Sequence, residues 1–394
     1  MKDQIEKYTG KLVADRSACA EGIAFAAQDD VLITAGATGL ARLAGATLSR
    51  LNALALVAAQ PLLPFAEFLL ARAAKEESCI VPQDTETRTF LHDIPFLRKD
   101  ELEDDPSAQV ARLLGNRKGV IVEGVGIIAV GAITVEQAYI NYSSVFHSTF
   151  VKYLQDLLKD GFLLPGEREA FEKFRRKWLK PLSAQGLVFR ERLSDDRDEI
   201  LSEVERVGRY TVERALVDSF FGNISAHAGE LIYISQTAAS LDELKGCIDP
   251  VPTGNSSTTG ITASSELLAH RKIFEQTGAK VILHGHPKFA VVMSMLCETK
   301  DCPIKDCWKD CPHVRHLGGT PVVAGEIGAG GLAKRVPPVI GETGSAIVYG
   351  HGVFAIGKEG FAEAFAAMVE VENYCREEYF RRLVSCQASV AQKI

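Results

Sequence analysis

The sequence predicts an α/β protein in which two copies of one folding unit follow each other along the chain. When the 394-residue chain is compared with itself, residues 122–131 align with residues 348–357, and residues 58–61 align with residues 284–287. Both alignments have the same offset of 226 residues (348 − 122 and 284 − 58). Agreement at two distant places indicates an internal repeat, which decides the domain count. In each half, short apolar runs typical of buried strands alternate with segments that have helical periodicity.

Composition and charge limit the partners and the compartment that we expect. A net charge of −7 without a basic run argues against nucleic acid or an anionic membrane as a partner. The first residues are polar and lack the apolar core of a signal peptide, and the longest apolar run, residues 120–133, is too short and too rich in glycine to cross a bilayer. Nine cysteines in a chain of this length do not fit a secreted disulfide scaffold, so a cytoplasmic protein is expected.

The first half has the elements of a mixed α/β layer. Residues 41–59 predict a helix that gives way to a strand, residues 65–75 predict a helix, and residues 119–130 predict a pair of buried strands. Apolar residues at helical spacing predict a long helix over residues 135–158. Dense charge of both signs follows, so we expect a first domain at 1–160, a charged helical connector at 161–199, and a second domain at 200–394.

Two apolar strands of the second half run into histidines. Residues 281–287 read Val-Ile-Leu-His-Gly-His-Pro, and His284 and His286 point to the same face of a strand because they are two residues apart. Pro287 ends the strand, since it has no amide hydrogen to donate to a neighbour. His351, flanked by glycines, follows the apolar strand near residue 347. Three neutral imidazoles are the set that a catalytic zinc ion takes while it leaves one position open.

Four motifs occur in one order in the second half, namely Gly222-Asn-Ile-Ser225, Ser264-Ser-Glu266, His284-Gly-His286 and His351-Gly352. With them, residues 200–394 resemble the class II aldolase/adducin family of divalent-metal lyases and epimerases. The resemblance implies a three-layer α/β/α domain with a mixed, largely antiparallel sheet, and hence two such domains in tandem. It also implies that His284, His286 and His351 bind a divalent metal, zinc first and Mn²⁺, Fe²⁺ or Co²⁺ as alternatives, and that Glu266 is the catalytic acid/base.

The same resemblance implies the residues that bind substrate, which are Asn223, Thr237, Ser264 and Ser265. Relatives that act on sugar phosphates often have Thr-Gly where this chain has Thr237-Ala238, so the alanine weakens the case for a phosphorylated substrate. Ser264-Ser265-Glu266 also fits a capped helix start, in which hydroxyls accept from free amides and an acid faces the positive end of the helix. Those amides and hydroxyls would equally hold an anionic group.

The first copy is predicted to keep the fold without the metal site. In the repeat register, Ala58, Gln60 and Val125 stand where the second copy has its three histidines, and Leu40 stands where it has Glu266. None of these side chains can bind a metal or move a proton as the originals would. The counterpart of the Gly222–Ser225 motif is expected to fall before residue 1, so the first copy is shorter.

A loop of the second half is rich in cysteine. Cys297, Cys302, Cys307 and Cys311 lie within fifteen residues, and His313 and His316 follow them. Thiolates and imidazoles of this kind bind structural zinc or an iron–sulfur cluster. The spacing matches neither a zinc ribbon nor a ferredoxin run, so a second metal site, a redox sensor and a reduced surface loop remain alternatives.

These observations predict a divalent-metal-dependent, aldolase-type lyase of carbohydrate metabolism. It would cleave a carbon–carbon bond of a small hydroxy-carbonyl or sugar-phosphate-like substrate through a metal-stabilised enediolate, with Glu266 moving the proton. Epimerase, dehydratase and decarboxylase reactions use the same intermediate and remain alternatives. An adducin-like, non-catalytic scaffold is a further alternative, against which the retained histidines and Glu266 argue. The resemblance implies a homo-oligomer, and we expect two chains to form a pseudo-fourfold ring.

Overall fold

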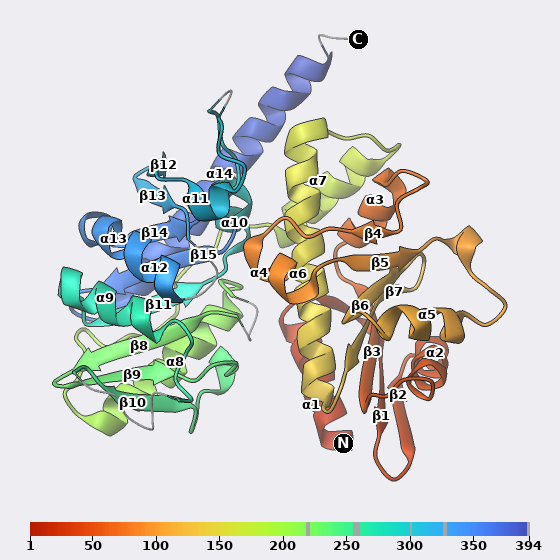
Figure 1. Cartoon of the computed structure of the whole chain (residues 1–394), viewed down its shortest axis with the longest axis horizontal. Coiled ribbons are helices and arrows are strands. Elements are labelled where there is room, and N and C mark those ends of the chain that lie inside the picture. Colours follow the sequence, from red (N-terminus) through yellow and green to blue (C-terminus); the bar gives the residue numbers. More distant parts are fainter. Residues whose placement is uncertain (218–220, 255–260, 300–301, 326–328, 392–394) are drawn as a thin grey trace. The chain divides into compact units, whose positions relative to one another are not determined.

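The chain folds into two compact units, Met1–Lys180 and Pro181–Ile394 (Figure 1). The computed structural model describes residues 1–217, 221–254, 261–299, 302–325 and 329–391. The boundary lies inside the segment 161–199, where we expected a connector: α7 (Glu167–Trp178) belongs to the first unit and α8 (Arg197–Glu213) to the second. Among the described helices, none has the length and apolar character needed to cross a bilayer.

The first unit is built on a seven-stranded sheet of order β2-β1-β3-β7-β6-β5-β4. Its strands are β1 (Ala18–Gln28), β2 (Leu32–Gly36), β3 (Ala55–Pro61), β4 (Cys79–Ile80), β5 (Ile94–Leu97), β6 (Gly119–Val122) and β7 (Gly126–Gly131). Its remaining helices are α1 (Lys2–Ala14), α2 (Thr38–Leu48), α3 (Phe65–Arg72), α4 (Thr85–Leu91), the short η1 (Lys99–Glu101), α5 (Pro106–Leu114) and α6 (Val135–Asp160). All strand pairs are antiparallel except β5–β6. Residues of α2 and α5 form one apolar core with the sheet, while α1, α3 and α4 contact α6.

The second unit repeats this plan with eight strands in the order β10-β9-β8-β11-β15-β14-β13-β12. Its strands are β8 (Asn223–Ala228), β9 (Leu231–Ser235), β10 (Ile248–Pro252), β11 (Val281–Gly285), β12 (Arg315–Leu317), β13 (Thr320–Val323), β14 (Ser345–Val348) and β15 (Gly352–Gly357). Its remaining helices are η2 (Leu241–Glu243), α9 (Leu267–Thr277), α10 (Lys288–Ser294), α11 (Cys307–Asp310), α12 (Ala329–Arg335), α13 (Pro337–Thr343) and α14 (Phe361–Ala391). Among the strand pairs that the structure describes in this unit, only β13–β14 is parallel.

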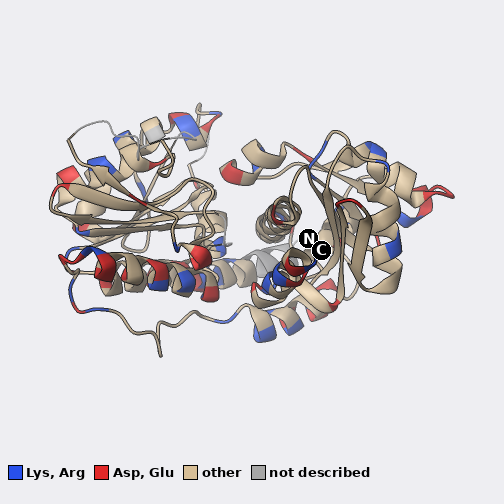
Figure 2. Cartoon of the chain, turned by 90° about the horizontal axis from the view of Figure 1, so that it is seen from below, with Lys and Arg blue, Asp and Glu red and all other residues tan. Residues whose placement is uncertain are grey.

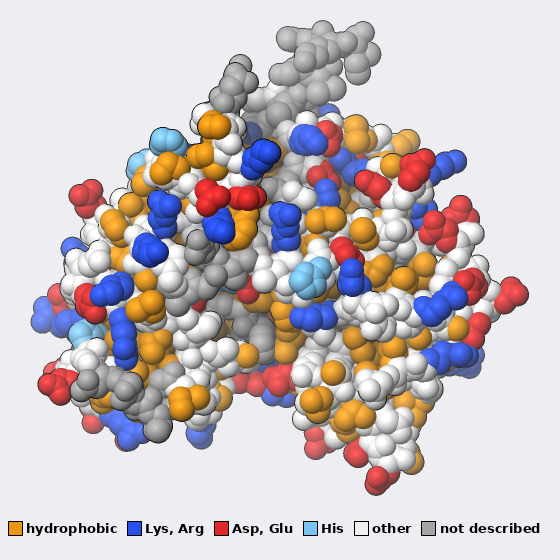
Figure 3. All heavy atoms as spheres, in the orientation of Figure 1, with side chains coloured by type: hydrophobic (Ala, Val, Ile, Leu, Met, Phe, Trp, Pro, Cys, Tyr) orange, Lys and Arg blue, Asp and Glu red, His pale blue; other side chains and the backbone are white. Residues whose placement is uncertain are grey.

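Helices cover both faces of each sheet, which confirms the predicted three-layer α/β/α architecture with largely antiparallel sheets. In the second unit, α9, α12 and α13 share one apolar core with the sheet, and α10 packs against α14, which lies along β11 and β15. Charged residues lie mainly on the helices and loops, as Figure 2 shows. On the face drawn in Figure 3, side chains of both signs are interspersed.

Backbone pairing confirms the internal repeat residue by residue. Ala55 pairs with Gly131 in the first sheet, and Val281 pairs with Gly357 in the second. Gly119 pairs with Ala129, as Ser345 pairs with Ala355, and the parallel pair Phe96–Ile121 has its equivalent in Val322–Ile347. Every one of these residues keeps the offset of 226. The helices α6 and α14 also begin at equivalent residues, Val135 and Phe361.

Two expectations about the first copy are wrong, because the offset changes upstream of β3. Ala24 of β1 pairs with Ala58, just as Asn223 of β8 pairs with His284, so the counterpart of Asn223 is present and is an alanine. The offset there is 199 (223 − 24). In the first unit, all of whose residues are described, β2 leads almost directly into α2, whereas β10 and a long loop intervene in the second. The helix starts then align Glu266 with Ala37, the residue before α2, rather than with Leu40.

Candidate metal centre

Three buried histidines meet at one end of β11 in the second unit. His284 lies in β11 and His286 just after it, and His351 lies in the turn between β14 and β15. The Nε2 atom of His284 is 3.1 Å from Nε2 of His286 and 3.2 Å from Nε2 of His351. One ligand atom from each ring lies within 4.8 Å of the others. The structure therefore brings together the three predicted ligands as a group that could hold a metal ion.

The backbone fixes how His284 presents its ring. Its Nδ1 lies 3.0 Å from the Val353 carbonyl, an acceptor, so Nδ1 carries the hydrogen and Nε2 keeps its lone pair. Phe354 stacks on the same ring at 4.0 Å between centroids. Burial lowers the pKa of His284 to about 4, so the ring is neutral at neutral pH. A neutral imidazole whose other nitrogen is held by a carbonyl is the form that binds a metal ion.

Glycine makes the close approach of the two histidine segments possible. A Cβ atom at Gly352 would lie 2.4 Å from the Gly285 carbonyl oxygen and 2.7 Å from Cδ2 of His286. A Cβ atom at Gly222, where φ is 91°, would lie 2.5 Å from the carbonyl oxygen of His284. The glycines beside the motifs are therefore required by packing around the cluster.

Glu266 turns its carboxylate toward the histidines instead of capping its own helix. It is the residue before α9, and its side chain makes no capping hydrogen bond. Oε1 lies 3.2 Å from Nε2 of His351, Oε2 lies 3.5 Å from Nε2 of His284, and the Asn223 amide donates to Oε2 at 2.8 Å. Burial alone would raise the pKa of Glu266, but His284, His351 and Asn223 together hold it below its ordinary value. The carboxylate is therefore ionised, and the capped-helix interpretation does not account for it.

The other predicted substrate residues lie around this carboxylate with different exposure. Asn223 and Ser264 are buried, and Oδ1 of Asn223 has no hydrogen-bond partner among the described residues. Ser265 and Thr237 are exposed, and the Thr237 hydroxyl donates to the Ala263 carbonyl next to Ser264. Ala238 has a positive φ of 61°, a conformation that favours glycine. Residues 255–260, which precede Ser264 in the chain, lie outside the described residues.

Sequence reasoning left His270 without a role, and the structure places it against the cluster. Its Nδ1 lies 2.7 Å from the Ser225 hydroxyl, and its ring meets Phe354 edge-on. Burial lowers the pKa of His270 to about 3, so this ring is neutral as well. The signal was the spacing, because a residue four positions after Glu266 faces the same side of a helix. Phe221, which also went unassigned, stacks on His286 at 5.6 Å.

The cysteine-rich segment does not form a second tight cluster. Cys297, Cys307 and Cys311 line one small cavity with His313. Burial raises the pKa of Cys307, and the thiols of Cys302, Cys311 and Cys297 raise it further. Among the described residues, however, only the three histidines place at least three ligand atoms within 4.8 Å of one another.

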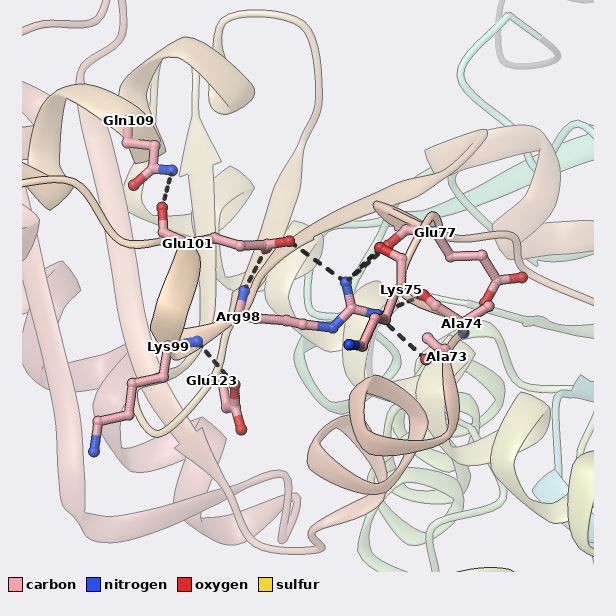
Figure 4. Close-up of polar contacts among 9 residues, drawn as sticks. All are labelled: Ala73, Ala74, Lys75, Glu77, Arg98, Lys99, Glu101, Gln109 and Glu123. Carbon is pink, nitrogen blue, oxygen red and sulfur yellow. Dashed lines mark hydrogen bonds and ion pairs between the residues drawn. The ribbon is translucent and has the colours of Figure 1, made fainter.

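In the first unit, hydrogen bonds within the chain hold the equivalent turn. The Gly124 amide, equivalent to Gly350, donates to Glu67 at 3.0 Å, and Glu123 accepts from the Lys99 amide at 2.8 Å. Nearby, the Arg98 guanidinium donates to carbonyls at the end of α3 and beyond, those of Ala73, Ala74, Lys75 and Glu77 (Figure 4). The turn is held in the same way in the second copy, where the Gly350 amide donates to the Ser294 hydroxyl at 2.8 Å. The two copies therefore differ in the side chains at the histidine positions, which are Ala58, Gln60 and Val125 in the first.

The fold and the site define the second unit as a three-layer α/β/α domain with a buried trihistidine cluster that could bind a metal. Residues 202–379 match the family described as Class II Aldolase and Adducin N-terminal domain, so this unit belongs to the class II aldolase/adducin family. No curated protein matches the chain.

Several solved structures are similar to about half of the chain. They include an L-fuculose-1-phosphate aldolase from Thermus thermophilus, with 23% identity over 48% of this chain and 97% of that one and a TM-score of 0.40. A sugar-phosphate aldolase from Thermotoga maritima has 21% identity over 48% of this chain and 96% of its own, with a TM-score of 0.37. The N-terminal class II aldolase domain of a conserved protein from Thermoplasma acidophilum has 14% identity over 48% and 99%, with a TM-score of 0.34.

Proposed function

We propose that the second unit is a divalent-metal-dependent lyase of the aldolase type, acting on a small hydroxy-carbonyl or sugar-phosphate-like compound. One observation carries the proposal: a buried, ionised carboxylate contacts two of three converging imidazoles, although its backbone position would let it cap a helix. Three imidazoles with a carboxylate beside them are the parts of a metal-assisted proton-transfer site. Class II aldolase/adducin membership supports the same reaction class.

His284, His286 and His351 would hold the metal through their Nε2 atoms. Three imidazoles at a buried site favour zinc among the common divalent ions, with manganese, iron and cobalt as alternatives. A bound divalent ion would supply Lewis-acid polarisation of the substrate carbonyl. Val353 and Phe354 orient His284 for this task, since they fix one ring nitrogen and one ring face.

Glu266 would move the proton. Asn223 holds Oε2, which leaves Oε1, on the His351 side, as the atom that takes the proton from the substrate and later returns it. The orphaned Oδ1 of Asn223 is buried beside this carboxylate, and a substrate hydroxyl that donates to it would satisfy it. Asn223 would thus orient both the base and the substrate.

Epimerase, dehydratase and decarboxylase reactions need the same carboxylate and remain second candidates, because each begins beside a polarised carbonyl. An adducin-like scaffold would not need the three histidines and the carboxylate of Glu266. The first copy shows what this fold looks like after the histidines and the carboxylate have gone, whereas the second copy keeps every member.

The test is a screen of metal-loaded protein against hydroxy-aldehydes, hydroxy-ketones and keto acids, with and without phosphate groups. Glu266→Gln should keep the metal and lose about 10²–10⁴-fold in turnover, as expected for removal of a general base. Glu275→Gln on the same helix, where Glu275 pairs with Lys272 at the surface, is the matched control and should retain activity. Equal activity of both variants, or no reaction with any compound by fully metal-loaded protein, would contradict the proposal.

A further inference from the structure

The cysteine-rich segment of the second unit lacks a core of its own. None of the described residues between 295 and 319 is buried. The first copy has an equivalent segment of the same length. The flanking strands, β3 and β5 in the first copy and β11 and β13 in the second, keep the offset of 226 on both sides of it. In the first copy the equivalent segment buries Ile80, Asp84, Thr85, Thr87 and Leu91. The second copy has exchanged these buried side chains for a surface segment.

The four thiols occur only in the exposed version of the segment. The residues of the first copy at the positions of Cys297, Cys302, Cys307 and Cys311 are Ala71, Glu76, Val81 and Thr85. The fold therefore does not require cysteine at these places. A segment without buried apolar surface needs another source of order, and in small proteins that source is a disulfide or a bound metal.

Main-chain contacts hold the segment to the body of the unit and leave a cavity under it. Arg315 donates to the Leu296 carbonyl and, at 2.6 Å, to the Ser294 carbonyl, and the Gly325 amide donates to the Trp308 carbonyl at 2.9 Å. The cavity measures about 10 Å³, and Cys297, Cys307, Cys311 and His313 line it together with Arg315 and Tyr349. This volume accommodates a single water-sized occupant.

We propose that Cys297, Cys307 and Cys311, with His313 as the fourth ligand, form a second metal site that takes a thiophilic divalent ion, zinc. Three thiolates and one imidazole are a closed structural set for zinc. The thiols of Cys307 and Cys311 now donate to the carbonyls of Ile304 and His313, at 3.7 and 3.9 Å, and side-chain rotation would turn the sulfurs toward the cavity. Each thiol that binds releases its proton to solvent. Disulfides between pairs of these cysteines would require an oxidant, and they would not explain why the His313 imidazole lines the same cavity.

Elemental analysis of zinc-loaded protein tests this site separately from the histidine cluster. The wild-type chain should bind one zinc ion that Cys307→Ser/Cys311→Ser loses and that His284→Ala/His286→Ala keeps. If the histidine site of the proposed function does not bind metal, only the histidine-dependent ion will be missing, and the cysteine-dependent ion will still be found. Cys247→Ser, outside the segment, is the matched control and should lose no ion. Circular dichroism should show that all variants are folded.

Cobalt substitution and proteolysis identify the ligands. Cobalt-loaded wild type should show a thiolate-to-cobalt charge-transfer band that is absent from Cys307→Ser/Cys311→Ser and unchanged in His284→Ala/His286→Ala. Trypsin should cut after Lys305 or Lys309 only when the ion is removed. Three results would overturn the proposal. The first is a wild-type chain that binds no ion that depends on the cysteines, the second is the absorption spectrum of an iron–sulfur cluster, and the third is a mass which shows that the cysteines have lost hydrogen and formed disulfides. Loss of the ion in Cys302→Ser but not in His313→Ala would overturn the ligand assignment.

Discussion

Substitution of Gly352 by alanine should damage the metal site without touching a ligand. The added methyl would lie 2.7 Å from Cδ2 of His286, 3.1 Å from Cε1 of His284 and 2.4 Å from the Gly285 carbonyl oxygen. Carbon atoms in ordinary contact are about 3.5–4.0 Å apart, so the ring of His286 or the backbone of β15 must move by about 1 Å. Metal–ligand distances tolerate only about 0.2 Å, so the strained cluster cannot keep its geometry.

The size of the effect follows from these distances. Overpacking of this kind costs about 1–3 kcal/mol, part of which the fold absorbs. Disturbance of the groups that orient metal ligands costs about 10–100-fold in metal affinity. We therefore expect Gly352→Ala to fold, to bind zinc about 10–100-fold more weakly in competition with a chromophoric chelator, and to lose activity in proportion.

Gly330→Ala is the matched control for this prediction. A Cβ atom at Gly330 in α12 meets nothing within 4 Å. Alanine in a helix is more stable than glycine by about 0.5–1 kcal/mol, so this variant should keep its zinc affinity and melt slightly higher. If Gly352→Ala binds zinc as tightly as Gly330→Ala does, the histidines are not held where the structure places them, and the reasoning fails.

Three further predictions concern stability. Arg72→Met in the first unit should lower the free energy of unfolding by about 3–5 kcal/mol, because it leaves buried Glu167, 2.7 Å from Arg72, without its cation. Denaturant unfolding measures this loss, and the metal content should not change. An unchanged unfolding midpoint would refute the prediction. Burial raises the pKa of Glu372 to about 7, so between its unfolded value and pH 7 the folded state binds the proton more tightly and stability falls as pH rises. Wild type should lose about 3 kcal/mol between about pH 5 and pH 8 that Glu372→Gln does not lose, and parallel pH profiles of the two proteins would contradict this. Zinc at about 100 times its dissociation constant should add about 2.7 kcal/mol to the second unit alone, so a chelator should lower one calorimetric transition and leave the other unchanged, whereas no shift would count against the site.

Sequence alone predicted the repeat and the elements that keep one register. Residues 122–131 and 348–357 align without a gap because they cover equivalent buried hairpins, β6–β7 and β14–β15, which pair in the same register. A shift of register by one residue would turn the buried side chains of a strand to its other face, so no insertion is tolerated there. The helix expected at 135–158 is α6, and its buried aromatic residues sit at the predicted spacing. The two-residue spacing predicted that His284 and His286 share one face of a strand. The family resemblance implied that His351 joins them, and the pairing of β11 with β15 brings it there.

Features that depend on insertions or on side-chain orientation were not predictable. The offset between the copies changes from 226 to 199 upstream of β3, because β10 and its loop occur in one copy only, and a gap-free comparison cannot place that change. Nothing in Ser264-Ser265-Glu266 decides whether the carboxylate caps α9 or faces the histidines; the contact with Asn223 decides it, and 43 positions separate the two residues. The contact between His270 and Ser225 likewise joins distant elements.

Anomalous X-ray scattering at the zinc edge, from crystals of the zinc-loaded chain, tests the central claim most directly. The peak should lie among the Nε2 atoms of His284, His286 and His351, and no peak should lie at Ala58, Gln60 and Val125 of the first copy. A second unit that shows no peak among the three rings, or a peak in the first copy, would contradict the account of one retained and one lost metal centre.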